Sequence, residues 1–175
     1  MMNIIESPSP HFRKGRRAAI DTIVVHYISA VDVNPDDPFN LEQILDLLRK
    51  PIEYTAEDGQ LEAVRVSAHY LVTRQGEIHR LVEEENVAWH AGISSLRGRQ
   101  LDNSCNEFSI GIELMGGEDF DYTDEEYQAL IELIRDIRTR YKIAAENIVG
   151  HDFIAPDRKE DPGPHFDWNR VREGL

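Results

Sequence analysis

The sequence predicts a single domain of the α/β or α+β class, because segments with strand periodicity alternate with segments with helix periodicity. Three features support this prediction: a β-branched apolar run at 20–28, a second strand-like run at 108–117, and an amphipathic helix pattern at 123–141. The 175 residues suit one domain with a buried core, and they contain no repeat, low-complexity segment or linker. We therefore expect one domain over 1–175.

The first half of the chain is predicted to form a strand, a short helix and a hairpin. Residues 20–28, IDTIVVHYI, have the composition of a buried strand. LEQILDLLRK at 41–50 is amphipathic and is followed by a proline, which predicts a short helix that ends there. The polar residues 52–64 are expected to form a loop. SAHYLVTRQGEIHRLV at 67–82 predicts a hairpin, with a glycine in its turn.

The second half begins with an irregular segment and contains two further strands. Residues 86–106 are rich in Gly, Ser and Asn, which favours irregular structure. FSIGIELMGG at 108–117 is strand-like and closes on a double glycine. NIVGH at 147–151 predicts a last strand, and a short terminal helix is expected around Trp168.

The clearest helix lies between these two strands. Thr123 and Glu126 have the spacing of a capping box, which marks a helix N-terminus. One apolar stripe with helical spacing follows: Tyr127, Leu130, Ile131, Ile134, Ile137 and Tyr141. We therefore predict a helix that buries this stripe against the sheet.

Composition limits the possible partners and the compartment. Nineteen basic and 33 acidic residues give a formal net charge of −14, which repels nucleic acid and anionic membranes at long range. No nucleic-acid partner is expected, and an anionic small substrate requires a locally positive site. Cys105 is the single cysteine, which rules out an internal disulfide and favours a reducing compartment. The N-terminus lacks the apolar region of a secretion signal and no apolar run is long enough for a membrane span, so a cytoplasmic location is predicted.

The segment GHDFIAPDRKEDPGP, at 150–164, places many ionisable side chains on a backbone stiffened by proline. It has two interpretations: a solvated, turn-rich connection, or a rigid support for a metal or substrate. Two histidines at the ends of apolar runs, His26 and His151, are either hydrogen-bonded structural residues or metal ligands. With Asp161, beside Pro-Gly-Pro, they would supply the three protein ligands of a catalytic zinc site.

Two further residues have possible catalytic roles. Glu113 lies on the polar side of the 108–117 strand, so it either faces water at an edge or is held as a general base whose pKa burial raises. Lys159 precedes Asp161 by two residues and points the same way in an extended segment. Lys159 is therefore either a solvated loop residue or a cation beside the metal.

The remaining histidines and Trp89 carry weaker signals. Trp89 and His90, in AWHAG, form either an aromatic edge of the core or a stacking surface for a sugar or peptide. His69 and His79 lie in the predicted hairpin and are interpreted as structural. The N-terminal segment is expected to be flexible, and the histidine in it receives no role, nor does the one after the rigid turn: His11 and His165.

Five motifs in order resemble the zinc-dependent N-acetylmuramoyl-L-alanine amidases, and most closely the cytoplasmic AmpD branch that recycles cell-wall fragments. They are VVHYIS, SAHYLVTRQGEIHRLV, AWHAG, CNEFSIGIELMG and GHDFIAPDRKEDPGPHFDW, and the match covers about 20–168. The resemblance implies a mixed central β-sheet flanked by helices, related to phage amidases and peptidoglycan recognition proteins. It implies one Zn²⁺ per chain on His26, His151 and Asp161, with Glu113 and Lys159 as the catalytic residues.

The activity that the resemblance implies is hydrolysis of the amide between N-acetylmuramic acid, in its 1,6-anhydro form, and L-alanine of the stem peptide. The expected partner is a muropeptide or peptidoglycan fragment, bound by Trp89, His90, Arg99, Arg158 and Tyr27. Tyr27 stands where the AmpD branch usually has asparagine, so a substrate contact is expected to differ. Two alternatives are a lytic amidase that attacks intact peptidoglycan and a non-catalytic muropeptide-binding module.

Overall fold

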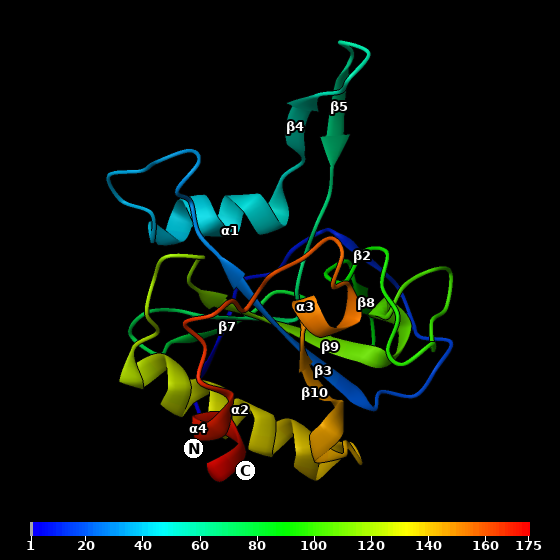
Figure 1. Ribbon diagram of the computed structural model, residues 1–175, viewed down its shortest axis with the longest axis vertical. Coiled ribbons are helices and arrows are strands. Elements are labelled where there is room, and N and C mark those ends of the chain that lie inside the picture. The colour runs from blue at the N-terminus through cyan, green and yellow to red at the C-terminus, as the bar shows by residue number, and fades with distance from the viewer. Residues whose placement is uncertain (1) are drawn as a thin grey trace.

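A six-stranded sheet forms the centre of the protein in the computed structural model, which describes residues 2–175 (Figure 1). Its strands are β1 (Ile4–Glu6), β3 (Thr22–Ile28), β6 (Tyr70–Val72), β7 (Ile78–Arg80), β9 (Ser109–Met115) and β10 (Ile148–Gly150). They lie in the order β1-β7-β6-β9-β3-β10. The β6–β7 pair is antiparallel and the other neighbouring pairs are parallel. The expected mixed sheet is therefore confirmed.

Helices cover both faces of this sheet. On one face lies α1 (Leu41–Arg49), and on the other lie α2 (Asp124–Arg140) and α4 (Trp168–Glu173) (Figure 1). Shorter turns of helix are η1 (Asn106–Phe108), η2 (Ala145–Asn147) and α3 (His151–Ile154). The α2 stripe joins the larger apolar core, whereas α1 packs in a second core with Leu71 and Met115. Among residues 2–175, no helix combines the length and the apolar character that a membrane span requires.

Alternation along β3 and β9 determines which side chains face α2 and which face the opposite side of the sheet. Ile110, Ile112 and Leu114 of β9 belong to the core under α2, as do Ile23 and Val25 of β3. Because successive side chains of a strand point to opposite faces, Glu113 and His26 face away from α2. The two residues are also direct partners in the β3–β9 register. The fold thus places them side by side on the α1 face of the sheet.

Most of the predicted elements are present. The 67–82 hairpin is β6 and β7, and Gly76 in its turn has φ of 78°. The helix start is also confirmed, because the Thr123 side chain accepts from the Glu126 backbone N–H and the Glu126 carboxylate accepts from the Thr123 backbone N–H. This reciprocal pair satisfies two N–H groups that a helix N-terminus otherwise leaves unpaired.

Two predictions were wrong. The expected loop at 52–64 is an antiparallel hairpin, β4 (Ile52–Thr55) and β5 (Leu61–Val64), that projects from the body next to α1 (Figure 1). Its turn contains Gly59 with φ of 82°, following an aspartate, a strong hairpin signal that the polar composition masked. The N-terminal segment is also ordered, because β1 adds a parallel edge strand to β7 and β2 (Phe12–Arg13) pairs with β8 (Val87–Ala88).

Candidate metal centre

Three side chains from separate elements converge at the carboxyl ends of β3 and β10. The Nδ1 atoms of His26 and His151 are 3.0 Å apart, and they lie 2.9 and 3.1 Å from Oδ2 of Asp161. All three residues are buried, with exposed fractions of 2%, 4% and 7%. Among residues 2–175 this is the one His/Cys/Asp/Glu group with the geometry of a metal site.

The sequence explains how these residues meet. β3 and β10 are parallel neighbours with Gly150 opposite Val25, so His151 starts α3 beside the end of β3. The Asp152 N–H donates to the Asp161 carbonyl (3.0 Å), which returns the loop onto the start of the helix. A Cβ on Gly150 would lie 2.7 Å from Cδ of Pro162, so this return requires glycine. His151 begins a short helix, whereas the sequence placed it at a strand end.

The donor set fits a divalent metal such as zinc. His151 Nε2 donates to the Ala91 carbonyl (2.9 Å), so in the neutral ring its Nδ1 keeps a lone pair that faces the Asp161 carboxylate. Burial lowers the pKa of His26 in spite of the nearby Asp161 carboxylate, which keeps this imidazole neutral, the form that binds a metal. Two imidazole nitrogens and one carboxylate are typical ligands of catalytic zinc.

Glu113 lies beside this cluster without a hydrogen-bond partner for Oε2. Burial raises the pKa of Glu113 well above its ordinary value, and the Asp161 charge adds to this effect while Lys159 opposes it. Lys159 is half-buried and lines the same cleft, which has a volume of about 510 Å³ and is also lined by His26, Tyr27, Glu113 and Asp161. The site therefore combines a metal-ligand set, a carboxyl group with a raised pKa and a cation around one open space.

The five residues expected to bind substrate have different positions. Tyr27, His90 and Arg158 line the cleft, but the Arg158 guanidinium donates to the carbonyls of Ala91 (2.8 Å) and Ile93 (2.9 Å). Arg99 is ion-paired with Asp21 and lies over the Phe108 ring, away from the cleft. The structure therefore does not bring Arg99 to the site.

The aromatic pair expected to stack on substrate is largely occupied by the protein itself. The Trp89 ring stacks on the His11 ring at 6.1 Å between centroids and is not part of the cleft lining. His90 is 7% exposed and its Nδ1 lies 2.9 Å from His26 Nε2. His11, expected to be in a flexible N-terminus, is buried. Sequence reasoning also missed two cleft residues, Val66 and Ser67, because nothing in their types signals a site.

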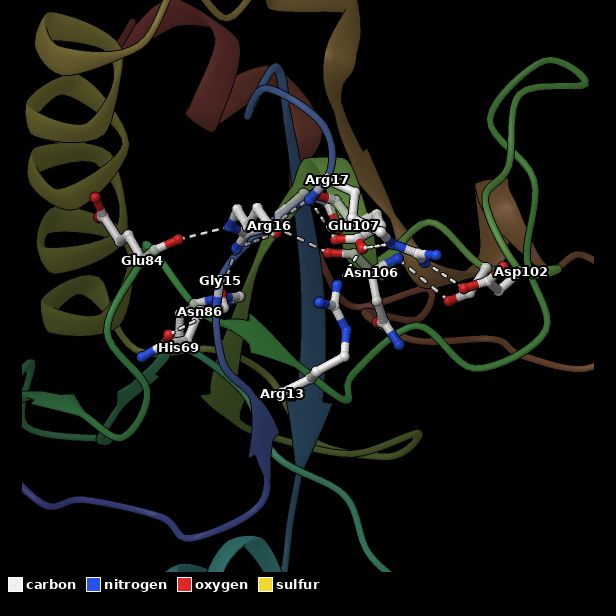
Figure 2. A network of polar contacts seen from close by, with 12 residues as sticks. Arg13, Gly15, Arg16, Arg17, His69, Glu84, Asn86, Asp102, Asn106 and Glu107 are labelled. Atoms are coloured by element: carbon white, nitrogen blue, oxygen red, sulfur yellow. Dashed lines mark hydrogen bonds and ion pairs between the residues drawn. The ribbon is translucent and has the colours of Figure 1, made fainter.

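A half-buried arginine, Arg16, fixes the loop behind the site (Figure 2). Arg16 donates to the backbone carbonyls of Glu84, Asn106, Glu107 and Ser109. Burial lowers the pKa of Arg16 to about 10, against the attraction of nearby carboxylates. Glu107 in turn accepts from Arg13 and Arg17. This network connects the N-terminal segment to the 106–109 turn, which leads directly into β9 and Glu113.

The chain is similar to known amidases over most of its length. The profile of the N-acetylmuramoyl-L-alanine amidase family matches residues 16–164. The chain is 42% identical over 168 residues to the 1,6-anhydro-N-acetylmuramyl-L-alanine amidase AmpD of Salmonella typhimurium (strain SL1344), covering 94% of this chain and 86% of that protein. A solved structure of a selenomethionine AmpD derivative has a TM-score of 0.83 at 39% identity, covering 100% and 99% of the two chains. Escherichia coli AmiD, solved with the substrate anhydro-N-acetylmuramic acid-L-Ala-D-γ-Glu-L-Lys, has a TM-score of 0.67 at 34% identity, covering 93% and 60%.

Proposed function

The chain belongs to the N-acetylmuramoyl-L-alanine amidase family, and from this premise we propose that its substrate is a 1,6-anhydromuropeptide released during peptidoglycan recycling. The protein is an amidase that hydrolyses the bond between N-acetylmuramic acid and L-alanine. The observation that carries the proposal is 42% identity over nearly the whole chain to an enzyme named for the anhydro substrate. The structure of Escherichia coli AmiD with an anhydromuropeptide substrate gives further support, as does a solved complex of Pseudomonas aeruginosa AmpDh3 with anhydromuramic pentapeptide.

The proposed cofactor is one zinc ion held by His26, His151 and Asp161. Zinc bound there would supply Lewis-acid polarisation of the amide carbonyl and lower the pKa of water. The chain's contribution is to present three ligand atoms from rigid elements, so that little reorganisation precedes metal binding. Their burial also keeps bulk water from competing for the ligand atoms.

Glu113 is proposed as the general base that takes a proton from the attacking water and passes it to the leaving amine. Its support is the unpartnered Oε2 atom, which has no internal hydrogen bond to give up. A raised pKa also brings Glu113 toward the range where a carboxyl group both accepts and donates a proton near neutral pH. A carboxylate at its ordinary pKa would be a weaker base and would take the proton from the attacking water less readily.

Lys159 is proposed to stabilise the negative charge that develops on the carbonyl oxygen. It is the cleft cation whose side chain has no protein acceptor among the described contacts, whereas the Arg158 guanidinium is engaged with backbone carbonyls. Electrostatic stabilisation of this kind contributes roughly 3 kcal/mol per donor in comparable sites. Tyr27 at the cleft wall is proposed to contact the sugar or the first peptide residue.

The test is to incubate the zinc-loaded protein with a defined anhydromuropeptide and to identify the products by mass spectrometry. Release of the anhydro sugar and the intact stem peptide is the expected result. Cleavage within the peptide, or at a glycosidic bond of a disaccharide substrate, would contradict the assignment. The cytoplasmic location expected from the sequence stays a prediction, which cell fractionation can test.

A further inference from the structure

His90 lines the floor of the cleft and is connected to the metal site by a chain of hydrogen bonds. Its Nδ1 atom is 2.9 Å from Nε2 of His26, and its Nε2 atom is 3.1 Å from Oγ of Ser109. The Ser109 hydroxyl is 2.7 Å from the Cys105 carbonyl. Two side chains, Ser109 and His90, thus link a backbone carbonyl to a proposed zinc ligand.

The carbonyl at the end of this chain fixes the direction of every hydrogen bond. A carbonyl only accepts, so the Ser109 hydroxyl donates to Cys105 and keeps a lone pair for His90. His90 Nε2 therefore carries the proton, and its Nδ1 accepts in the neutral ring. His26 must then donate from Nε2, which leaves the lone pair of its Nδ1 directed at Asp161 and His151.

The neighbouring residue Ala91 performs the same task for the second histidine. Its carbonyl accepts from His151 Nε2 at 2.9 Å, so both metal-site histidines are oriented by adjacent residues of one segment. This segment is itself fixed, because the Asn106 side-chain oxygen accepts from the N–H groups of His90 (3.2 Å) and Ala91 (2.8 Å). Asn106 lies in the turn that Arg16 holds in place (Figure 2).

The sequence of β9 leaves room for this arrangement. A Cβ on Gly111 would lie 2.4 Å from Cγ of His90, a distance that no side chain tolerates. Glycine at this position therefore lets the His90 ring lie against the strand between His69 and His26, whose ring centroids are 5.8 and 5.1 Å away. A glycine inside a buried strand is otherwise unfavourable, which indicates that the close approach has a purpose.

We propose that His90 is a positioning residue for the metal site, and that the segment His90–Ala91 selects the tautomer of both histidine ligands. In this role His90 acts on the metal through His26. The inference depends on the proposed zinc site. Partners of this type typically change metal affinity by about 10- to 100-fold when they are removed.

The test compares zinc affinities measured by competition with a chromophoric chelator. His90→Phe keeps a ring but removes the acceptor, and we expect a 10- to 100-fold weaker zinc affinity. His90→Asn places an oxygen at the position of Nδ1 and should restore the affinity to within about threefold of wild type. Ser109→Ala should cause a smaller loss than His90→Phe, because His90 is then free to take either tautomer.

A matched control is His79→Phe, which replaces another buried histidine that has a serine partner at 2.8 Å. It should leave zinc affinity unchanged. Circular dichroism on each variant establishes that it is folded. Equal zinc affinity in wild type and folded His90→Phe would overturn the proposal.

Nitrogen-15 NMR of the zinc-loaded protein gives an independent readout. We expect His90 as the Nε2–H tautomer, with a through-hydrogen-bond coupling between His26 Nε2 and His90 Nδ1. A Nδ1–H tautomer of His90 would also overturn the proposal. A wild-type protein that binds zinc and shows this coupling, but has no amidase activity, would refute the proposed function and leave the positioning role standing.

Discussion

Replacement of Glu113 by glutamine is expected to lower activity and to raise stability at the same time. Glutamine has nearly the same shape as glutamate but cannot accept the proton from water. Loss of a positioned general base typically costs about 10²- to 10⁴-fold in rate. We therefore expect Glu113→Gln to lose at least about 100-fold in kcat with anhydromuropeptide, while zinc content is unchanged.

The stability change follows from the surroundings of the carboxyl group. Glu113 is 8% exposed, and its Oε2 atom has no hydrogen-bond partner. A buried unpaired polar group costs about 1–3 kcal/mol, and more when it is charged. The glutamine amide also leaves one atom unpaired, so we expect a gain in the free energy of unfolding at the lower end of this range, about 1 kcal/mol. This gain corresponds to a rise in Tm of roughly 2–4 °C for a protein of this size.

The stability difference between Glu113→Gln and wild type should depend on pH. Burial raises the pKa of Glu113 above its unfolded value, so the folded protein loses stability as pH rises above the unfolded pKa and toward the folded one. The variant should therefore gain stability over wild type at pH 8 and approach it near pH 4. The assay is thermal unfolding with a chelator present, so that metal binding does not contribute. A variant within tenfold of wild-type activity, or one less stable at pH 8, would refute the assigned role of Glu113.

Three other expected outcomes concern the metal, the fold and the substrate. Asp161→Ala should abolish zinc binding and activity with little change in circular dichroism, and a variant that retains stoichiometric zinc by elemental analysis would be evidence against Asp161 as a ligand. Burial, with the Arg16 charge, lowers the pKa of His69 to about 3, so its stabilising contribution is complete above pH 6.5 and is lost as pH falls toward 3. Between pH 6.5 and 5 the free energy of unfolding should therefore fall by about 2 kcal/mol. Urea unfolding of His69→Asn should show a weaker pH dependence than that of wild type. With a net charge of −14, the protein should cleave intact sacculi more slowly than the soluble fragment at low salt. The rate on sacculi should rise when about 0.1 M salt screens the repulsion, and equal rates on both substrates at low salt would favour a lytic amidase.

Local patterns were sufficient to predict the central elements of the fold. The β3 and β9 runs are apolar enough to identify strands from composition, and the capping box marks the start of α2 within one turn. The β4–β5 hairpin was missed because its side chains face solvent on both sides, which removes the apolar alternation that identifies a strand. The edge strand β1 was missed because three residues carry too little periodicity.

In the candidate site, too, local sequence patterns predicted some residues and missed the contacts of others. His26, His151 and Asp161 were predicted as a group because each stands beside a rigid element, and the structure brings them together. Arg99 and Trp89 do not line the cleft, because their side chains contact residues far away in the sequence, Asp21 and His11. Only the folded chain reveals these contacts. The link from His90 to His26 spans 64 residues and was likewise inaccessible to local patterns.

The most direct test of the central claim is a zinc titration of the chelator-treated protein with 1,6-anhydromuropeptide as substrate. The rate of free stem-peptide release should be near zero without metal, rise in proportion to added zinc, and reach its plateau at one equivalent per chain. Full activity in protein shown to be metal-free by elemental analysis would contradict the assignment of His26, His151 and Asp161 as the ligands of a catalytic zinc ion.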